Sequence, residues 1–292
     1  MKQRKIGHFS VSAIGLGAMP MSIEGRPERQ RSIATVHAAI EVGVSLIDTA
    51  DAYHLAGRDE VGHSEALIGE ALRTYPGDTS HVIVATKGGH LRPAEGPWAL
   101  NGDPAYLKEA AKASAWRLGV DSIDLYQYHR PDPGVPYAES IGALAELLDE
   151  GVIRMAGISN VNVHQIKEAN MVLTGRLASV QNQFSPRFRS SEEELRLCAE
   201  LGVAFMPWSP LGGISSAPKL GWLHGGFGAV GQRLGVSPQV VALAWEMAKS
   251  EVVIPLPGAS RPESIFDSAT AAELELSQDD IQLLDSGEAR AA

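Results

Sequence analysis

The chain has 292 residues, of which 44% are apolar, so it can fold around a sizeable core. Its 35 acidic residues outnumber its 25 basic residues, and the net charge of −10 argues against a nucleic-acid partner, because a phosphate backbone requires a basic face. Cys198 is the only cysteine, which excludes an intramolecular disulfide and a cysteine-based metal cluster.

In chain order, the first predicted element is a β-hairpin over the first dozen residues, where Gly7 separates two short runs. Eight apolar runs then have the length and composition of strands. These runs span residues 13–17, 45–48, 82–87, 123–129, 155–160, 179–184, 204–209 and 252–256.

Amphipathic helical segments separate the strands. Two cap residues precede a first-turn proline, and two residue pairs have the spacing of a capping box. The caps are Asp103 and Ser237, and the pairs are Asn162 with Gln165 and Ser191 with Glu194. Five helical segments end in a glycine directly before an apolar run, which is typical of a left-handed C-terminal cap. These glycines are Gly43, Gly119, Gly151, Gly175 and Gly202.

Strands that alternate with helices indicate a parallel sheet covered by helices. Eight such units in 292 residues predict an α/β fold, a single (β/α)8 TIM barrel domain over residues 1–292, with the N-terminal β-hairpin and extra helices. Residues 210–237, which are rich in glycine, form the longest segment predicted to be irregular, and residues 88–102 form the next longest. Long loops in compact domains usually serve function.

Polar side chains stand at the C-terminal ends of six predicted strands, where the active site of such a barrel lies. They are Asp48, Lys87, His129, Asn160, Gln181 and Ser209. The chain has no nucleophilic serine in a G-x-S-x-G turn, and its histidines lack metal-ligand spacing, so we expect no metal site.

Tyr53 follows the Asp48 strand and completes a set of four chemically selective residues. A free tyrosine has a pKa near ~10, and a nearby ammonium favours its phenolate form, so Lys87 could lower the pKa of Tyr53 and Asp48 could hold Lys87. His129 could donate a hydrogen bond to a substrate oxygen. This set suits a reaction that creates an alkoxide in need of a proton, such as hydride transfer to a carbonyl.

At these residues the sequence resembles the aldo-keto reductases, of the bacterial type with a short C-terminal tail. The resemblance covers residues 4–288 and follows six motifs in order. The motifs are LIDTA at 46–50 with Tyr53 beyond it, GHSEALIG at 62–69, ATK at 85–87, DLYQYH at 124–129, GISN at 157–160 and QNQ at 181–183.

The resemblance implies roles for the four residues. Tyr53 would be the proton donor, Lys87 would adjust its pKa, Asp48 would pair with Lys87, and His129 would orient the carbonyl. The chain would then reduce aldehydes or ketones reversibly with NADPH (NADP+ in the reverse direction), and its partner would be a small carbonyl substrate.

The resemblance also implies a cofactor site with three parts. The first part, which would bind the nicotinamide carboxamide and stack on its ring, comprises Ser159, Asn160, Gln181 and Trp208. The second part, along the pyrophosphate, comprises Ser209, Leu211 and Gly212. The third part, at the 2′-phosphate, comprises Gly258, Ser260, Arg261 and Ser264. Ser264 and Ser268 depart from the family, which commonly has glutamine or glutamate and asparagine there.

Two further features concern the surroundings of the cofactor. Residues 226–231 fit the string G-x-G-x-x-G, but no convincing strand precedes them, so we expect them to lie in the loop near the cofactor and not in a Rossmann turn. The substrate pocket would be shaped by residues 88–102, 130–136 and the loop after Trp208. Trp98, Tyr53, Trp208 and His54 would line it, which favours apolar or aromatic carbonyls.

Two alternatives remain open. The same fold serves as a cofactor-binding sensor subunit with negligible turnover, as in the β subunits of potassium channels. A barrel lyase could instead form a Schiff base on Lys87. The first ten residues lack a signal peptide and no apolar run reaches the roughly 18 residues of a membrane span, so we expect a cytoplasmic protein, a monomer or weak homo-oligomer, without a membrane partner.

Overall fold

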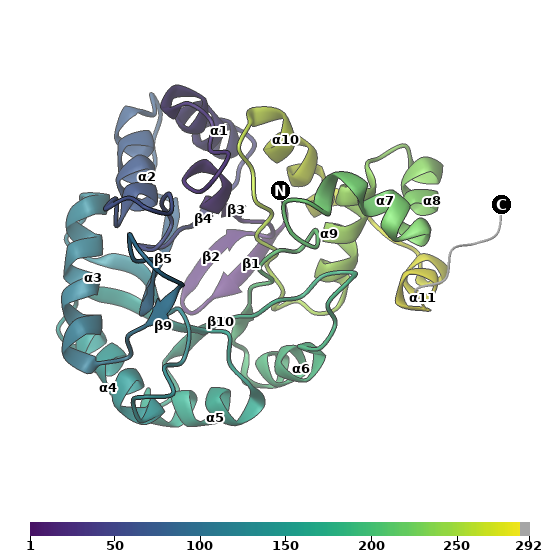
Figure 1. Cartoon of the computed structure of the whole chain (residues 1–292). Helices are drawn as coiled ribbons and strands as arrows, with labels where there is room; N and C mark the ends of the chain where they lie inside the picture. The colour runs from purple at the N-terminus through teal and green to yellow at the C-terminus, as the bar shows by residue number, and fades with distance from the viewer. Residues whose placement is uncertain (287–292) are drawn as a thin grey trace.

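The structure is a computed structural model that describes residues 1–286. Seven parallel strands form a curved sheet in the order β11-β10-β9-β8-β5-β4-β3 (Figure 1). Their bounds are β3 Leu16–Gly17, β4 Leu46–Asp48, β5 Ile83–Gly88, β8 Ile123–Tyr128, β9 Ile153–Ser159, β10 Leu177–Gln181 and β11 Ala204–Phe205.

Residues 253–258 take the eighth position and close the sheet into a barrel. They make single parallel bridges to both edges of the sheet, from Val253 to Phe205, from Leu256 to Trp208 and from Gly258 to Gly17. The predicted (β/α)8 barrel is therefore confirmed. The predicted strand 252–256 is present only as these isolated bridges, and the predicted strand 204–209 is regular only over β11.

The predicted N-terminal hairpin is also confirmed. Strands β1 (Gln3–Ile6) and β2 (Phe9–Ser12) pair antiparallel. Ile6 and Val11 of this hairpin belong to the same buried cluster as Leu46 and Leu125 of the barrel strands, so the hairpin covers one end of the barrel interior. A second, larger apolar cluster fills the space between the strands and the surrounding helices.

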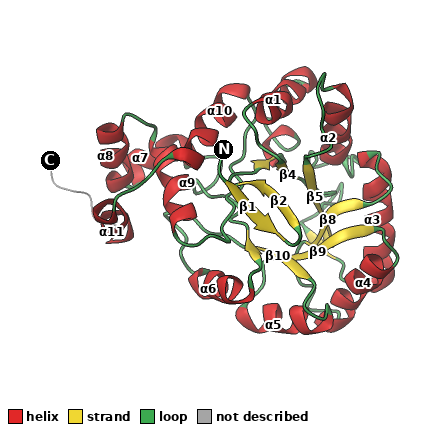
Figure 2. Cartoon of the chain, turned by 180° about the vertical axis from the view of Figure 1, so that it is seen from behind, coloured by secondary structure: helices red, strands yellow, loops and turns green. Residues whose placement is uncertain are grey.

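Helices surround the barrel on its outside, and a small group projects to one side (Figures 1 and 2). The surrounding helices are α1 Arg29–Glu41, α2 His63–Thr74, α3 Pro104–Leu118, α4 Tyr137–Asp149, α5 Val163–Val172, α6 Glu192–Leu201, α9 Pro238–Ala248 and α10 Pro262–Thr270. The projecting helices are α7 Leu220–Leu223, α8 Gly225–Leu234 and α11 Gln278–Ser286. Among residues 1–286, no helix is long and apolar enough to cross a membrane.

Most predicted helix caps are present. Asp103 accepts a hydrogen bond from Tyr106 N, Ser237 accepts one from Val240 N, and Asn162 with Gln165 forms a complete capping box. All five glycines predicted at helix ends have positive φ. The capping box predicted at Ser191 is wrong, because the Ser191 side chain makes no cap hydrogen bond.

The prediction that residues 210–237 are irregular is wrong for most of the segment, because residues 217–223 and 225–234 form a 3-10 turn, α7 and α8. The string 226–231 lies inside α8, so it is neither a loop beside a cofactor nor a Rossmann turn. Its glycines permit close packing: a Cβ added at Gly228 would lie 2.8 Å from the Gly221 carbonyl oxygen, and one at Gly231 would lie 2.8 Å from the Val236 carbonyl oxygen. Packing therefore outweighs the low helix propensity of glycine here.

Short elements flank the open end of the barrel. They are the 3-10 turns Met19–Met21 and Ala217–Lys219, and the two-stranded ribbon of β6 (His90–Leu91) and β7 (Ala99–Leu100). The 3-10 turn Ala271–Glu273 lies instead beside the N-terminal hairpin, where Lys2 N donates to Glu273 Oε1 at 3.0 Å. Along the strands, alternate residues face the barrel interior. The interior positions are apolar at Leu46, Ala85 and Leu125. Two residues further along each of these strands, the inward-facing residues are polar. They are Asp48, Lys87 and Gln127, so a buried polar layer lies at the C-terminal ends of the strands.

Candidate active site

Lys87 lies at the centre of the buried polar layer. Its side chain has no exposed surface, and its ammonium donates to Asp48 Oδ2 at 2.6 Å, to the Thr49 carbonyl at 2.8 Å and to the Tyr53 hydroxyl at 3.3 Å. The structure therefore brings together three of the four residues singled out in the sequence. The Schiff-base alternative requires Lys87 Nζ to reach a substrate carbonyl, and the enclosure of this atom argues against it.

The loop after β4 brings Tyr53 to Lys87. Thr49 N donates to the Ala85 carbonyl at 2.8 Å and Asp51 N donates to the Lys87 carbonyl at 3.3 Å, so the loop stays attached to β5 beyond the end of β4. Gly62 N donates to the Asp51 carbonyl at 2.7 Å and ties the loop to the start of α2. These backbone contacts fix the position of Tyr53 independently of the contact between its hydroxyl and Lys87.

The ionisation of this pair differs in part from the expectation. Burial lowers the pKa of Lys87, but the Asp48 carboxylate and Tyr53 outweigh burial and raise it, so Lys87 is an ammonium. Burial raises the pKa of Tyr53 above its ordinary value, and the opposing effect of Lys87 does not cancel it. The expected lowering of the Tyr53 pKa is therefore absent, and Tyr53 is a neutral phenol near neutral pH.

Asp48 connects this pair to the rest of the layer. Its second oxygen, Oδ1, accepts from Gln181 Nε2 at 2.8 Å and from Gln127 Nε2 at 3.3 Å. Gln127 was not singled out in the sequence, although it stands two residues before His129 on the same strand. The signal that could have found it is the alternation along β8, which places Gln127 inward beside Lys87.

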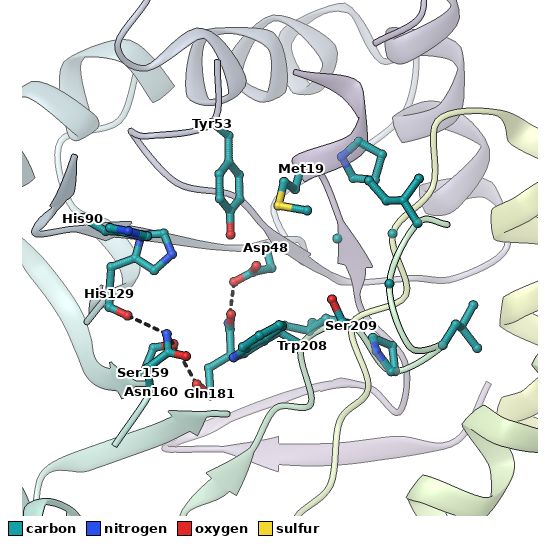
Figure 3. A pocket seen from close by; sticks show the side chains of 18 of the residues that line it. Met19, Asp48, Tyr53, His90, His129, Ser159, Asn160, Gln181, Trp208 and Ser209 are labelled. Atoms are coloured by element: carbon teal, nitrogen blue, oxygen red, sulfur yellow. Dashed lines mark hydrogen bonds between the residues drawn. The ribbon is translucent and has the colours of Figure 1, made fainter. Parts of the chain in front are cut away.

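His129 lies beside Tyr53, and their ring centroids are 5.8 Å apart (Figure 3). Burial holds the pKa of His129 well below its ordinary value, and the nearby Lys87, His90 and Arg130 lower this pKa further. Its Nδ1 has no hydrogen-bond partner among the described residues. A neutral imidazole at this place can donate a hydrogen bond to a ligand oxygen.

Three side chains beyond His129 form a connected polar edge (Figure 3). Asn160 Nδ2 donates to the His129 carbonyl at 2.9 Å and to Ser159 Oγ at 3.0 Å, and Ser159 Oγ donates to the Gln181 carbonyl at 2.7 Å. Asn160 adopts a left-handed backbone conformation with φ of 59°, which turns the chain at the end of β9. The donor contacts of Asn160 and Gln181 leave an amide oxygen of each as an acceptor.

Trp208 lies beside Gln181 on the far side of the site from Tyr53 (Figure 3). It is half-buried, and its indole Nε1 has no partner within residues 1–286. Ser209 follows with φ of 51°, so the chain turns sharply at the end of this segment.

These residues border a cavity of about 270 Å³ at the C-terminal end of the barrel. Ten residues predicted for the site line it: Asp48, Tyr53, His129, Ser159, Asn160, Gln181, Trp208, Ser209, Leu211 and Gly258. Five others do not line it: Lys87, Gly212, Ser260, Arg261 and Ser264. Lys87 lies beneath the cavity, enclosed by Asp48 and Tyr53.

The cavity also has lining residues that were not predicted, or were predicted wrongly. Trp98 lines it as expected. His54 does not, because it is fully buried with its Nδ1 on the Leu55 carbonyl at 3.0 Å, so that prediction is wrong. His90 lines it from within the predicted segment 88–102, although it was not singled out. Met19 was not predicted to line the cavity, since no sequence signal separates it from an ordinary loop residue.

The 257–264 segment begins beside the cavity and leaves it. Gly258 borders the cavity, and a Cβ added there would lie 2.8 Å from Pro20 Cγ. Arg261, which precedes α10, is exposed, and its Nε donates to Ser264 Oγ at 2.9 Å. Among residues 1–286, no group of three or more His, Cys, Asp or Glu side chains could hold a metal ion.

Comparisons with known proteins agree with this architecture. The sequence profile of the Aldo/keto reductase family matches residues 13–220 and 223–288. An uncharacterized oxidoreductase of Schizosaccharomyces pombe is 37% identical over 285 residues, which are 96% of this chain and 88% of the relative. A 6-dehydroglucose reductase of Novosphingobium aromaticivorans is 36% identical over 285 residues, which are 95% of this chain and 92% of the relative.

Among the solved structures, two are similar over nearly the whole chain. An aldo/keto reductase from Klebsiella pneumoniae in complex with NADP and acetate is 26% identical, with a TM-score of 0.81, and the match covers 98% of this chain and 94% of that one. A glycerol dehydrogenase from Gluconobacter oxydans is 25% identical, with a TM-score of 0.84 and coverage of 99% and 95%.

Proposed function

The chain belongs to the aldo/keto reductase family, and from this premise we propose that it reduces aldehydes or ketones to alcohols with NADPH, using Tyr53 as the proton donor. The observation that carries the proposal is the contact of the Tyr53 hydroxyl with the buried Lys87 ammonium at 3.3 Å, beside the cavity. A fixed ammonium at this distance stabilises the phenolate that remains once Tyr53 has given up its proton.

The side chains present fit the nicotinamide end of the cofactor. Asn160 and Gln181 each turn an amide oxygen away from their donor contacts, and Ser159 adds a hydroxyl, so the edge suits a carboxamide. Trp208 offers an aromatic face beside it, which suits a flat ring. When bound, NADPH supplies the hydride. The fit rests on the hydrogen bonds that orient these amides.

The remaining cofactor residues are proposed along a path away from the cavity. Ser209, Leu211 and Gly212 would follow the pyrophosphate, and Gly258, Ser260, Arg261 and Ser264 would surround the 2′-phosphate. The Arg261 guanidinium is exposed and could form a charge-assisted contact with this phosphate. The Klebsiella pneumoniae relative, whose structure contains NADP, supports the choice of cofactor.

The residues of this chain would carry the proton chemistry. His129, which is neutral, donates a hydrogen bond to the substrate carbonyl oxygen and orients it beside Tyr53. As hydride adds to the carbonyl carbon, the π electrons of the C=O bond move to oxygen, and this oxygen takes the proton of the Tyr53 hydroxyl. Water then returns a proton to Tyr53. In the reverse direction the Tyr53 phenolate accepts the proton of an alcohol.

Steady-state kinetics test the proposal. The purified chain is mixed with NADPH and a panel of aromatic and aliphatic aldehydes, the loss of NADPH absorbance is followed, and the alcohol product is identified by NMR. Turnover with formation of one alcohol for each NADPH consumed supports the proposal. Binding of NADPH without turnover across the panel contradicts it and favours a sensor subunit instead.

A further inference from the structure

Arg130 is a cavity-lining cation without a counter-ion. It directly follows His129, lines the cavity and is half-buried. No acceptor within residues 1–286 forms a hydrogen bond or an ion pair with its guanidinium. By contrast Arg92, near the same opening, is held by both carboxylate oxygens of Glu24. A half-buried guanidinium with unused donors at a cavity is poised to bind an acceptor from a ligand.

The other titratable groups around the cavity leave the charge of Arg130 uncompensated. Asp48 is neutralised by Lys87 at 2.6 Å. Burial, with Arg130 adding to it, lowers the pKa of His90 to about 4, and burial holds the pKa of His129 well below its usual value, so both rings are neutral near pH 7. The lining therefore carries one net positive charge.

The position of Arg130 assigns this charge to the substrate and not to the cofactor phosphates. Around the closed sheet, which runs from β3 through β4, β5, β8, β9, β10 and β11 to residues 253–258, β8 is the fourth strand position and residues 253–258 are the eighth. Arg130 follows β8, so it lies across the barrel from the segment that leads to the proposed phosphate contacts. It lies instead on the side of His129, which orients the carbonyl.

We propose that the natural substrate is an aldehyde or ketone that also carries a carboxylate, and that Arg130 binds this carboxylate while Tyr53 and His129 hold the carbonyl. The inference rests on the proposed reductase function. A planar guanidinium matches a carboxylate in a bidentate pair. A single positive charge matches a monoanion, whereas a phosphate dianion would leave one negative charge unpaired in a cavity with no second free cation among the described residues.

Matched substrate pairs test this assignment. The values of kcat/KM with NADPH are compared for 4-carboxybenzaldehyde and methyl 4-formylbenzoate, and for 5-oxopentanoate and pentanal. They are measured for wild type and for the variants Arg130→Met and Arg130→Lys. Because the difference in carbonyl reactivity is the same for every variant, the change in the ratio between variants reports the contribution of Arg130 alone. Glyceraldehyde and its 3-phosphate form a third pair that separates phosphate from carboxylate.

We expect the carboxylate-to-neutral ratio to fall by about 10- to 100-fold in Arg130→Met, the range that a charge-assisted hydrogen bond provides, mainly through KM. Arg130→Lys keeps the charge but loses the bidentate geometry, so its ratio should lie between the two. Arg92→Met is the control, because this arginine is already paired with Glu24, and its ratio should match wild type.

Two outcomes overturn the inference while leaving the reductase function intact. In the first, the enzyme reduces both carboxylates and both of their neutral partners, and Arg130→Met leaves the carboxylate-to-neutral ratio of kcat/KM unchanged. The other is a larger Arg130-dependent preference for the phosphate than for the carboxylates. Absence of turnover with every compound would instead overturn the proposed function, and the inference with it.

Discussion

Gln181 donates its Nε2 to Asp48 Oδ1 at 2.8 Å, although the two residues are 133 positions apart in the sequence. The other oxygen of the same carboxylate holds Lys87 at 2.6 Å. One carboxylate therefore positions both the ammonium beside Tyr53 and the amide beside the proposed carboxamide site. A change at Asp48 should disturb proton transfer, cofactor binding and stability together.

The stability effect of Asp48 can be stated as a prediction. Asp48→Asn removes the counter-ion of a fully buried ammonium, and breaking a buried ion pair from one side costs about 3–5 kcal/mol. The free energy of unfolding from urea denaturation should fall by that amount. The double variant Asp48→Asn, Lys87→Met removes both charges and should recover much of the loss without recovering activity. An Asp48→Asn variant as stable as wild type would contradict the buried pair.

The pH dependence follows from the raised pKa of Tyr53 and the lowered pKa of His129. Tyr53 stays protonated, and so able to donate, until the pH approaches its raised pKa, and His129 stays neutral above its lowered pKa. The kcat/KM for carbonyl reduction should therefore be flat between about pH 6 and pH 9. Alcohol oxidation requires the Tyr53 phenolate and should rise with pH over this range. A change in the kcat/KM for carbonyl reduction with an apparent pKa near neutral pH would contradict these protonation states of Tyr53 and His129.

Cofactor preference tests Arg261. Its guanidinium is exposed at the start of α10, and a charge-assisted contact with the 2′-phosphate is worth about 1.5–3 kcal/mol. Arg261→Gln should reduce the ratio of kcat/KM for NADPH over NADH by about 10- to 100-fold. The kcat/KM with NADH itself should stay near wild type. An unchanged ratio of kcat/KM for NADPH over NADH would contradict a contact between Arg261 and the 2′-phosphate.

Glu246, which lies outside the candidate active site, should make the free energy of unfolding depend on pH. It is fully buried in α9, and both of its carboxylate oxygens lack a partner within residues 1–286. Burial raises its pKa well above the ordinary value, so the folded chain binds a proton that the unfolded chain releases above about pH 4.3. Stability is therefore full below that pH and falls as the pH rises toward the folded pKa.

Glu246→Met removes the titrating group, so thermal unfolding should show a variant more stable than wild type at pH 7, by about 1–3 kcal/mol, with the difference shrinking toward pH 4. The exposed Glu200→Met in α6 serves as the control and should show no such trend. If the two variants behave alike, Glu246 is not the titrating group.

The sequence predicted the barrel and much of the candidate site because strand ends carry a local signal. Asp48, Lys87 and His129 each end an apolar run, and closure of a parallel barrel brings such ends together. Gln127 lacked this signal because it lies inside a strand, and only the inward alternation selects it. The raised pKa of Tyr53 could not be predicted either, since burial, which outweighs Lys87, appears only when the barrel closes.

The segment 210–237 shows the opposite limit of sequence reasoning. Its glycines predicted a loop by propensity, yet those between residues 221 and 231 lie in helices α7 and α8, where Gly228 packs on the Gly221 backbone and leaves no room for a Cβ. Such contacts join residues that no local pattern links. Arg130 likewise has no distinguishing pattern, and only the cavity and the pairing of its neighbours make its free charge visible.

The role of Tyr53 is tested most directly by single-turnover kinetics of Tyr53→Phe. This variant removes one hydroxyl and leaves the contact between Lys87 and Asp48 in place. Excess enzyme with bound NADPH is mixed with an aldehyde, and NADPH oxidation is followed by stopped flow, while calorimetry gives the Kd for NADPH. We predict an unchanged Kd and a hydride-transfer rate constant lower by about 10²- to 10⁴-fold, the contribution of a general acid. A rate constant equal to that of wild type would contradict Tyr53 as the proton donor.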